Sequence, residues 1–257
     1  MLNYISSLNK NKNPLVFIHG IGSTSKIFQK QIKQFGKKYY TVSLDLPGYG
    51  KSKTIENVTI DNYAIAVYNF LESIKIKSPI LLGHSLGGMI VQQILSNHPF
   101  YARAAILVGT TSKFGGKDDI WKKNFINSRL KPLKDGKKLK EISKNSIMKI
   151  VGPKTDSKII DFASKMLSSI SEKSYISAVK SLKDFDLKNE LKKITIPTLI
   201  IAGENDNQAP ANMMKNMSQN IKKSEFKIIK ESGHLINIEK SKEFNETLQN
   251  YFLKYNL

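Results

Sequence analysis

The chain has no cysteine and only four histidines among its 257 residues. Without cysteine it can form no disulfide, and it offers neither a thiolate nucleophile nor a zinc–thiolate site. The absence of cysteine fits a reducing compartment, and the histidines are scattered along the chain. We therefore expect no metal and no organic cofactor.

Long apolar runs are missing as well. No stretch approaches the roughly 20 apolar residues that a membrane-spanning helix needs. The opening residues, Met1 to Tyr4, do not begin a basic segment followed by an apolar core, the pattern of a secretion signal. We therefore expect a soluble, unexported, cytoplasmic protein with no membrane span.

Arginine is scarce, although the chain is strongly basic. Lys and Arg number 41 against 21 Asp and Glu, which gives a formal net charge of +20, yet only Arg103 and Arg129 are arginines. Proteins that read nucleic acids depend on arginine for bidentate contacts, and the lysines here run from Lys10 to Lys254 without forming one block. We expect no nucleic-acid partner and interpret the lysines as solvated surface charge.

Short apolar runs alternate with helical stretches along most of the chain. The runs are almost continuously hydrophobic, as strands covered on both faces should be, and the alternation predicts a mostly parallel sheet with crossover helices. We expect strands at residues 15–18, 40–44, 80–82, 104–108, 198–202 and 226–229. Helices are expected to follow Thr24, Ile60, Leu86, Pro210 and Ser241.

The strand pattern disappears between Thr110 and Ile196. Apolar residues recur there at helical spacings of three and four, as in residues 159–170. We interpret this segment as a helical lid whose Met and aromatic side chains mostly pack between helices, while a few face a substrate pocket. The predicted organisation is an α/β core formed by residues 1–110 and 197–257, with a lid formed by residues 111–196.

A strand-like run at residues 79–82 leads directly into the sequence GHSLG at residues 83–87 and then into a helical stretch. In this setting a Gly-x-Ser-x-Gly turn exposes its serine at the edge of a sheet, and the small residues permit the tight backbone. The pattern predicts a nucleophile at Ser85. The alternative is a glycine-rich turn that only packs a helix on a sheet.

A serine hydroxyl needs a histidine to accept its proton. His234 follows the last expected strand, where a loop can bring its ring over the edge of the sheet, and we expect it to be the general base. His19 and His84 are expected to be structural, the first by bracing its own loop. His98 precedes a proline at the end of a helix and is interpreted as a cap or surface residue.

The histidine needs an acid to orient it, and Asp206 and Glu204 both follow the strand that ends at Ala202. We favour Asp206, because Glu204 comes so soon after the strand that it has less reach toward His234. The chain order is then Ser, Asp, His, as in folds that carry this serine turn. The alternative role for Asp206 is to cap the helix that begins near Pro210.

An oxyanion formed during acyl transfer needs two fixed N–H donors. One is expected from Leu86, which follows the nucleophile. The other is expected from the loop HGIG at residues 19–22, most simply the backbone of Ile21. His19, Gly20 and Gly22 would support that loop, since glycine lets the backbone approach the substrate.

Five segments together resemble the α/β-hydrolase superfamily. They are HGIG at residues 19–22, DLPGYGKS at 45–52, the Ser85 turn, the Asp206 loop and SGH at 232–234. The resemblance implies an eight-stranded, mostly parallel sheet with helices on both faces, a Ser85–His234–Asp206 triad and a cap over residues 111–196. Few residues precede the first strong strand, so the initial antiparallel strands are expected to be abbreviated or missing.

Within the superfamily, the chain is similar to small carboxylesterases, 3-oxoadipate enol-lactonases and pimeloyl-carrier-protein methyl ester esterases. The leading hypothesis is hydrolysis of a carboxylic ester or lactone through an acyl-enzyme on Ser85. A methyl ester carried by an acyl carrier protein is an alternative, which the lysines of residues 131–140 would suit. Hydrolysis of a carbon–carbon bond is another, and a receptor-like protein with little turnover is an alternative of a different class.

Overall fold

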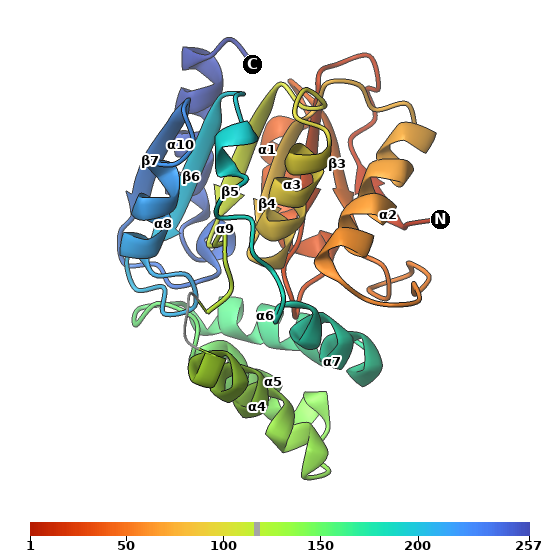
Figure 1. The fold of residues 1–257 in the computed structure, drawn as a ribbon, viewed down its shortest axis with the longest axis vertical. Helices are drawn as coiled ribbons and strands as arrows, with labels where there is room; N and C mark the ends of the chain where they lie inside the picture. The colour runs from red at the N-terminus through yellow and green to blue at the C-terminus, as the bar shows by residue number, and fades with distance from the viewer. Residues whose placement is uncertain (116–118) are drawn as a thin grey trace.

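A seven-stranded sheet forms the centre of the computed structural model, which describes residues 1–115 and 119–257 (Figure 1). The strands are β1 (Tyr4–Ser6), β2 (Pro14–Ile18), β3 (Tyr40–Leu44), β4 (Ile80–His84), β5 (Ala104–Val108), β6 (Thr198–Gly203) and β7 (Ser224–Ile229). All six expected strands are present. β4 extends two residues further than expected, to His84, and β7 begins two residues earlier, at Ser224.

The sheet is parallel except at one edge. Its strands lie in the order β1-β3-β2-β4-β5-β6-β7, and only β1 is antiparallel to its neighbour, pairing Tyr4 with Leu44 and Ser6 with Val42. The expectation of eight strands is wrong for the part of the chain that the structure describes. β2 begins at Pro14, so the segment before it holds the three-residue β1 and little else.

Helices cover both faces of the sheet. α2 (Ile60–Ser73), α3 (Leu86–Asn97) and α8 (Ala211–Ser218) lie on one face, and α1 (Gln29–Phe35) and α10 (Ser241–Lys254) lie on the other (Figure 1). Every residue of β3, β4, β5 and β6 is therefore buried. This burial explains why the strands read as continuous apolar runs. The helix expected after Thr24 begins with the 3-10 turn η1 (Ser25–Phe28) before α1 continues it.

In the described part of the segment between β5 and β6, four helices form a group at one end of the sheet (Figure 1). They are α4 (Asp119–Lys134), α5 (Leu139–Met148), α6 (Ser157–Ser168) and α7 (Glu172–Ser181), and the short turn η2 (Leu191–Lys193) leads back to the sheet. Met166 and Tyr175 pack inside this part of the molecule, whereas Trp121, Met148 and Phe162 are exposed. Packing between helices therefore accounts for fewer of the large side chains than expected.

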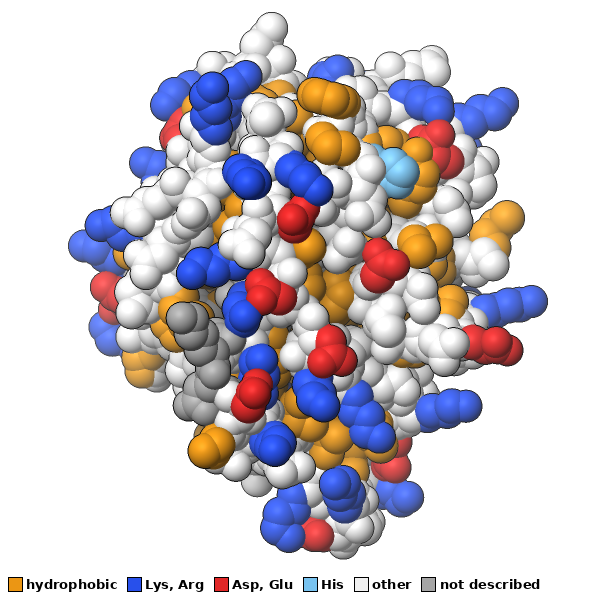
Figure 2. Space-filling model, in the orientation of Figure 1, with side chains coloured by type: hydrophobic (Ala, Val, Ile, Leu, Met, Phe, Trp, Pro, Cys, Tyr) orange, Lys and Arg blue, Asp and Glu red, His pale blue; other side chains and the backbone are white. Residues whose placement is uncertain are grey.

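The basic side chains are spread over the surface. Figure 2 shows Lys and Arg scattered over the whole of one face, with acidic side chains between them. Many lysines are paired, as Lys131 is with Asp135 at 2.7 Å and Lys144 with Asp161 at 3.0 Å. No helix in residues 1–115 or 119–257 has the length and apolar character needed to cross a membrane.

Candidate active site

Ser85 lies on the turn between β4 and α3, with φ 54° and ψ −118°. A non-glycine residue rarely adopts a positive φ, so the surrounding structure must hold this backbone in place. The Ser85 N–H donates to the Val108 carbonyl at 2.8 Å, and the Ser85 carbonyl accepts from the Thr110 hydroxyl at 2.8 Å. The end of β5 and the residues after it thus hold the serine at the carboxyl edge of the sheet.

Glycines around Ser85 allow the elements to approach closely. A Cβ atom on Gly83 would overlap the carbonyl of Gly87, and one on Gly87 would overlap the carbonyl of Ile18. A Cβ on Gly20 would lie 2.9 Å from Cβ of Ser85. The loop after β2 therefore lies directly against the serine.

His234 and Asp206 form a buried pair. Nδ1 of His234 is 2.8 Å from Oδ2 of Asp206, and the other carboxylate oxygen accepts from the backbone N–H groups of Gln208 (2.8 Å) and Ala209 (3.1 Å). Burial alone would raise the pKa of Asp206, but the charge and hydrogen bond of His234 and these N–H donors together lower it. The carboxylate therefore stays ionised and fixes the proton of His234 on Nδ1, which leaves Nε2 to accept a proton.

The competing carboxylate, Glu204, is engaged elsewhere. It is exposed, and its Oε2 accepts from the backbone N–H of Glu231 at 2.9 Å. The geometry therefore favours Asp206 as the partner of His234. Gly109 permits this arrangement, since a Cβ at that position would lie 3.3 Å from both Oδ2 of Asp206 and Nδ1 of His234.

The other histidines have structural surroundings. His19 is buried, donates from Nδ1 to the Gly20 carbonyl at 2.9 Å and accepts on Nε2 from the Leu46 N–H at 3.0 Å. Burial lowers its pKa to about 4. His98 is exposed and stacks on Tyr68, with ring centroids 4.0 Å apart.

His84 also has its ring buried, and it contacts the loop of His234. Its Nε2 donates to the His234 carbonyl at 2.7 Å. Burial and, next, the nearby His234 lower the pKa of His84 to about 3, so the ring is neutral. The backbone N–H of His234 in turn donates to the Ile150 carbonyl at 2.7 Å. The backbone N–H and the backbone carbonyl of His234 are therefore both held by hydrogen bonds.

The expected oxyanion donors lie around the same space. Leu86 is the first residue of α3, where backbone N–H groups have no acceptor within the helix. Ile21 lines a cavity of about 70 Å³ together with Ser85 and His234, which we call the inner cavity. Gly22 has φ 81°, and a Cβ atom on it would lie 3.3 Å from Cδ1 of Leu167 in α6.

Ser85 and His234 meet at the inner cavity without a direct hydrogen bond between their side chains in the described part of the chain. Hydrogen bonds between catalytic groups often tighten only when substrate binds. The remaining wall is largely apolar, from Met89, Phe114, Phe125 and Leu182. Such a wall suits the acyl portion of a small substrate.

Sequence reasoning missed several residues that shape the site. Thr110 holds the Ser85 carbonyl, and its place two residues after the end of β5 was the available signal. Glu239 accepts four hydrogen bonds, from the N–H groups of Gly152, Gly233 and Leu235 and from the Thr155 hydroxyl, at 2.7–3.0 Å. It ties the His234 loop to the segment after α5, and no motif marks it.

No group of three or more His, Cys, Asp or Glu side chains suited to a metal ion occurs within residues 1–115 and 119–257. The histidines that lie close together, His84 and His234, are committed to protein partners through Nε2 and Nδ1 respectively.

Comparison with known proteins identifies relatives along most of the chain. The chain is 27% identical to 3-oxoadipate enol-lactonase 1 of Acinetobacter baylyi over 238 residues, covering 91% of this chain and 86% of the relative. It is 33% identical to a pimeloyl-[acyl-carrier protein] methyl ester esterase of Wigglesworthia glossinidia brevipalpis over 209 residues, covering 78% and 77%. A thermophilic esterase from Thermogutta terrifontis shares the fold, with a TM-score of 0.87 at 19% identity over 100% of this chain and 94% of that one.

The family model for the alpha/beta hydrolase fold matches residues 13–241, which span every strand of the parallel part of the sheet and all the candidate site residues. The resemblance seen in the sequence is thus confirmed at the level of the family. The chain belongs to the alpha/beta hydrolase fold family.

Proposed function

We propose that this protein is a serine hydrolase that cleaves a small carboxylic ester or lactone through an acyl-enzyme on Ser85. The observation that carries the proposal is the juxtaposition at the inner cavity. A serine on a strained turn shares that cavity with His234, whose ring is held 2.8 Å from the ionised Asp206. Named relatives that hydrolyse an enol-lactone and a methyl ester support the same bond class.

In the proposed first half-reaction, Nε2 of His234 accepts the Ser85 proton as Oγ attacks the ester carbonyl carbon. Asp206 stabilises the resulting imidazolium. The backbone N–H groups of Leu86 and Ile21 bind the oxyanion of the tetrahedral intermediate. When the intermediate collapses, the carbon–oxygen bond breaks, and His234 returns the proton to the leaving alkoxide.

In the second half-reaction, water attacks the acyl-enzyme while His234 accepts its proton. When the second tetrahedral intermediate collapses, the bond between the acyl carbon and Oγ of Ser85 breaks, His234 returns the proton to Oγ, and the carboxylic acid leaves. With a lactone the alcohol and acid remain in one molecule, so a hydroxy acid leaves at this stage. No cofactor takes part in either step.

We also propose that helices α4 to α7 act as the lid of this site. Phe125 of α4 and Leu182, just after α7, line the inner cavity, so these helices close the space above Ser85. A lid of this kind shields the acyl-enzyme from bulk water and selects the acyl group. The core is then formed by residues 1–110 and 197–257, with the lid at 111–196.

The direct test compares the protein with Ser85→Ala on p-nitrophenyl esters of increasing chain length and on simple lactones. We expect release of acid and alcohol from the unaltered protein and none above background from Ser85→Ala. A fluorophosphonate probe should label Ser85 only. Retained turnover in Ser85→Ala would contradict the mechanism, whereas a folded protein with neither turnover nor labelling would favour a ligand-binding role. Product analysis with diketones tests carbon–carbon bond hydrolysis.

A carrier-linked ester is the second candidate, because the methyl ester esterase relative acts, by its name, on a pimeloyl group attached to acyl carrier protein. Of the exposed lysines at 131, 134, 137, 138 and 140, the first two lie on α4, the last lies on α5 and the other two lie in the connection between these helices. An acidic carrier would be attracted to them. Charge reversal at Lys134 and Lys140 should then raise KM for a carrier-linked ester and leave a small ester unaffected. Equal kinetics on both would count against a carrier protein.

A further inference from the structure

A second cavity, which we call the outer cavity, adjoins the inner one. It has a volume of about 380 Å³, against about 70 Å³ for the inner cavity, and the two share Phe125, Arg129, Ile150 and Gln208 in their walls. Ligand sites generally enclose about 300–1,000 Å³. The inner cavity therefore holds the reacting groups, and the remainder of a substrate must extend past the shared wall into the outer cavity.

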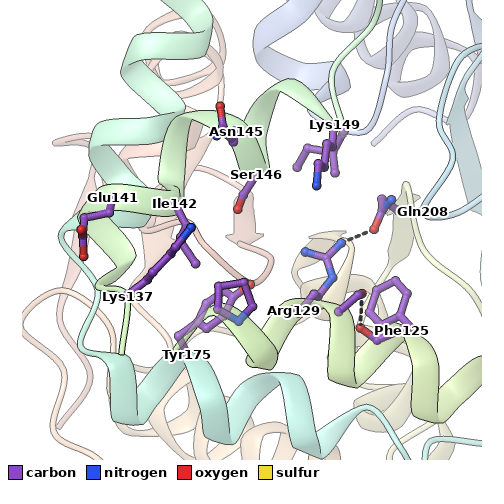
Figure 3. A pocket seen from close by; sticks show the side chains of 13 residues that line it. Phe125, Arg129, Lys137, Glu141, Ile142, Asn145, Ser146, Lys149, Tyr175 and Gln208 are labelled. Carbon is purple, nitrogen blue, oxygen red and sulfur yellow. Dashed lines mark hydrogen bonds between the residues drawn. The ribbon is translucent and has the colours of Figure 1, made fainter. Parts of the chain in front are cut away.

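The wall of the outer cavity is positively charged. It carries Arg129, Lys137 and Lys149 and a single carboxylate, Glu141. Figure 3 shows Arg129 and Lys149 on the side of Gln208, with Lys137 and Glu141 across the cavity. The Glu141 carboxylate caps the start of α5, where its Oε2 accepts from the backbone N–H of Lys138 at 2.6 Å.

The three cations have no acidic partner in the part of the chain that the structure describes, where every ion pair joins other residues. Lys137 and Lys149 are exposed, so water screens their charge. Arg129 is half-buried and lies where the two cavities meet. It is therefore the cation best placed to bind a group on a substrate.

Neutral groups hold Arg129 in position. Its guanidinium donates to the side-chain oxygen of Gln208 and lies over the ring of Phe125, 4.5 Å from the centroid (Figure 3). The backbone N–H of Gln208 donates to Asp206 at 2.8 Å. Gln208 therefore links Arg129 to the Asp206–His234 pair. The charge of the guanidinium has no acidic partner among the described residues, and the guanidinium has further N–H donors available.

We infer that Arg129 binds a carboxylate of the substrate, so that the protein prefers esters or lactones that carry a second, free carboxylate. The inference rests on the proposed function, in which the scissile carbonyl lies at Ser85 in the inner cavity. The free carboxylate then lies in the outer cavity against the planar guanidinium, a geometry that favours bidentate pairing. Lys149 and Lys137 attract the anion from a greater distance.

The kinetic test uses the monomethyl half-esters of succinate, glutarate, adipate and pimelate, each compared with a neutral methyl ester of matching length. Arg129→Gln should lower kcat/KM for the preferred half-ester by about tenfold to a hundredfold, the usual effect of losing a hydrogen bond to a charged group. The neutral esters should change by less than about threefold. An equal loss on both kinds of ester, or no loss on either, would overturn the inference.

Lys123→Gln is the matched control. It removes the same charge from the same helix, but Lys123 is exposed and lies outside both cavities. It should leave the preference for half-esters unchanged. A loss equal to that of Arg129→Gln would mean that net charge, and no carboxylate site, sets the preference.

A binding measurement separates this inference from the proposed function. Monomethyl adipate is titrated by calorimetry into Ser85→Ala and into the Ser85→Ala, Arg129→Gln double variant. We expect Kd to rise about tenfold or more in the double variant. If no ester is turned over but this Arg129-dependent binding remains, the hydrolase proposal fails and the carboxylate site stands. If inorganic phosphate binds Ser85→Ala as tightly as monomethyl adipate does, the assignment to a carboxylate is wrong.

Discussion

The His84 side chain donates a hydrogen bond from Nε2 to the backbone carbonyl of His234, at 2.7 Å. The residue directly before the candidate nucleophile thereby positions the candidate base. Because burial lowers the pKa of His84 to about 3, the ring stays neutral and does not repel a proton arriving on His234. Two residues that are 150 positions apart in the chain are thus linked at the centre of the site.

Replacing His84 with Leu should lower kcat without abolishing folding. The His234 carbonyl would lose its donor, which costs about 1–3 kcal/mol for a buried group, and the loop would shift. We expect kcat on a neutral ester to fall by about tenfold or more. His84→Gln, which keeps an N–H donor, should recover part of the rate. Equal kcat for His84→Leu and the unaltered protein would show that this hydrogen bond does not position His234.

Asp206→Asn tests the choice of acid. An amide can donate to Nδ1 of His234 and so favour the wrong tautomer, and kcat should fall by roughly 10⁴-fold, as in a comparable Ser-His-Asp triad. Glu204→Gln is the control, because Glu204 is exposed and a glutamine can still accept from the Glu231 N–H. Steady-state kinetics on one p-nitrophenyl ester measures both. A larger loss in Glu204→Gln than in Asp206→Asn would reverse the assignment.

The two buried histidines predict that stability falls in mild acid. In the folded protein burial lowers the pKa of His19 to about 4 and that of His84 to about 3, against about 6.5 in an unfolded chain. Between these values the unfolded chain binds protons that the folded protein does not. Above pH of about 6.5 these histidines do not reduce the free energy of unfolding. As pH falls below that value, the free energy of unfolding decreases, by at most about 1.4 kcal/mol per pH unit for each histidine.

Urea unfolding between pH of about 7 and about 5 measures how the free energy of unfolding changes with pH. This interval lies above the range in which carboxyl groups titrate. His84→Gln should reduce the slope by up to one proton. His98→Gln is the control, because His98 is exposed. An unchanged slope in His84→Gln would mean that His84 does not stay neutral in the folded protein.

Gly83→Ala should prevent the turn at Ser85 from forming. Its Cβ would overlap the Gly87 carbonyl, and Gly87 cannot retreat because it packs against the Ile18 carbonyl. We expect a loss of more than about 3 kcal/mol in the free energy of unfolding. Gly136→Ala is the comparison: φ is +88°, but no atom lies within 4 Å of the added Cβ, so the cost should be about 1–2 kcal/mol. Thermal unfolding followed by circular dichroism distinguishes the two.

Much of the sheet could be predicted because its strands are covered on both faces. Leu15 to Ile18 and Ala104 to Val108 are apolar throughout, which marks them in any window of sequence. An abbreviated antiparallel strand before β2 was expected, but the position of β1 was not, because it has three residues at an edge and is held by backbone pairing to β3. Edge pairing of this kind leaves little trace in side-chain pattern.

Local sequence alone determined the family, the order of the strands along the chain, and the placement of Ser85, Asp206 and His234 in the turns and loops that follow strands. These follow from short-range chemistry: glycines that permit a tight turn, apolar runs and the loops that end them. Only the tertiary structure decided that Asp206 and not Glu204 reaches His234, that His84 holds the His234 peptide, and that Arg129 lies between two cavities. Each of these contacts joins residues that are far apart in the sequence and come together only because distant elements pack against each other. No periodicity or motif in the sequence indicates such a contact.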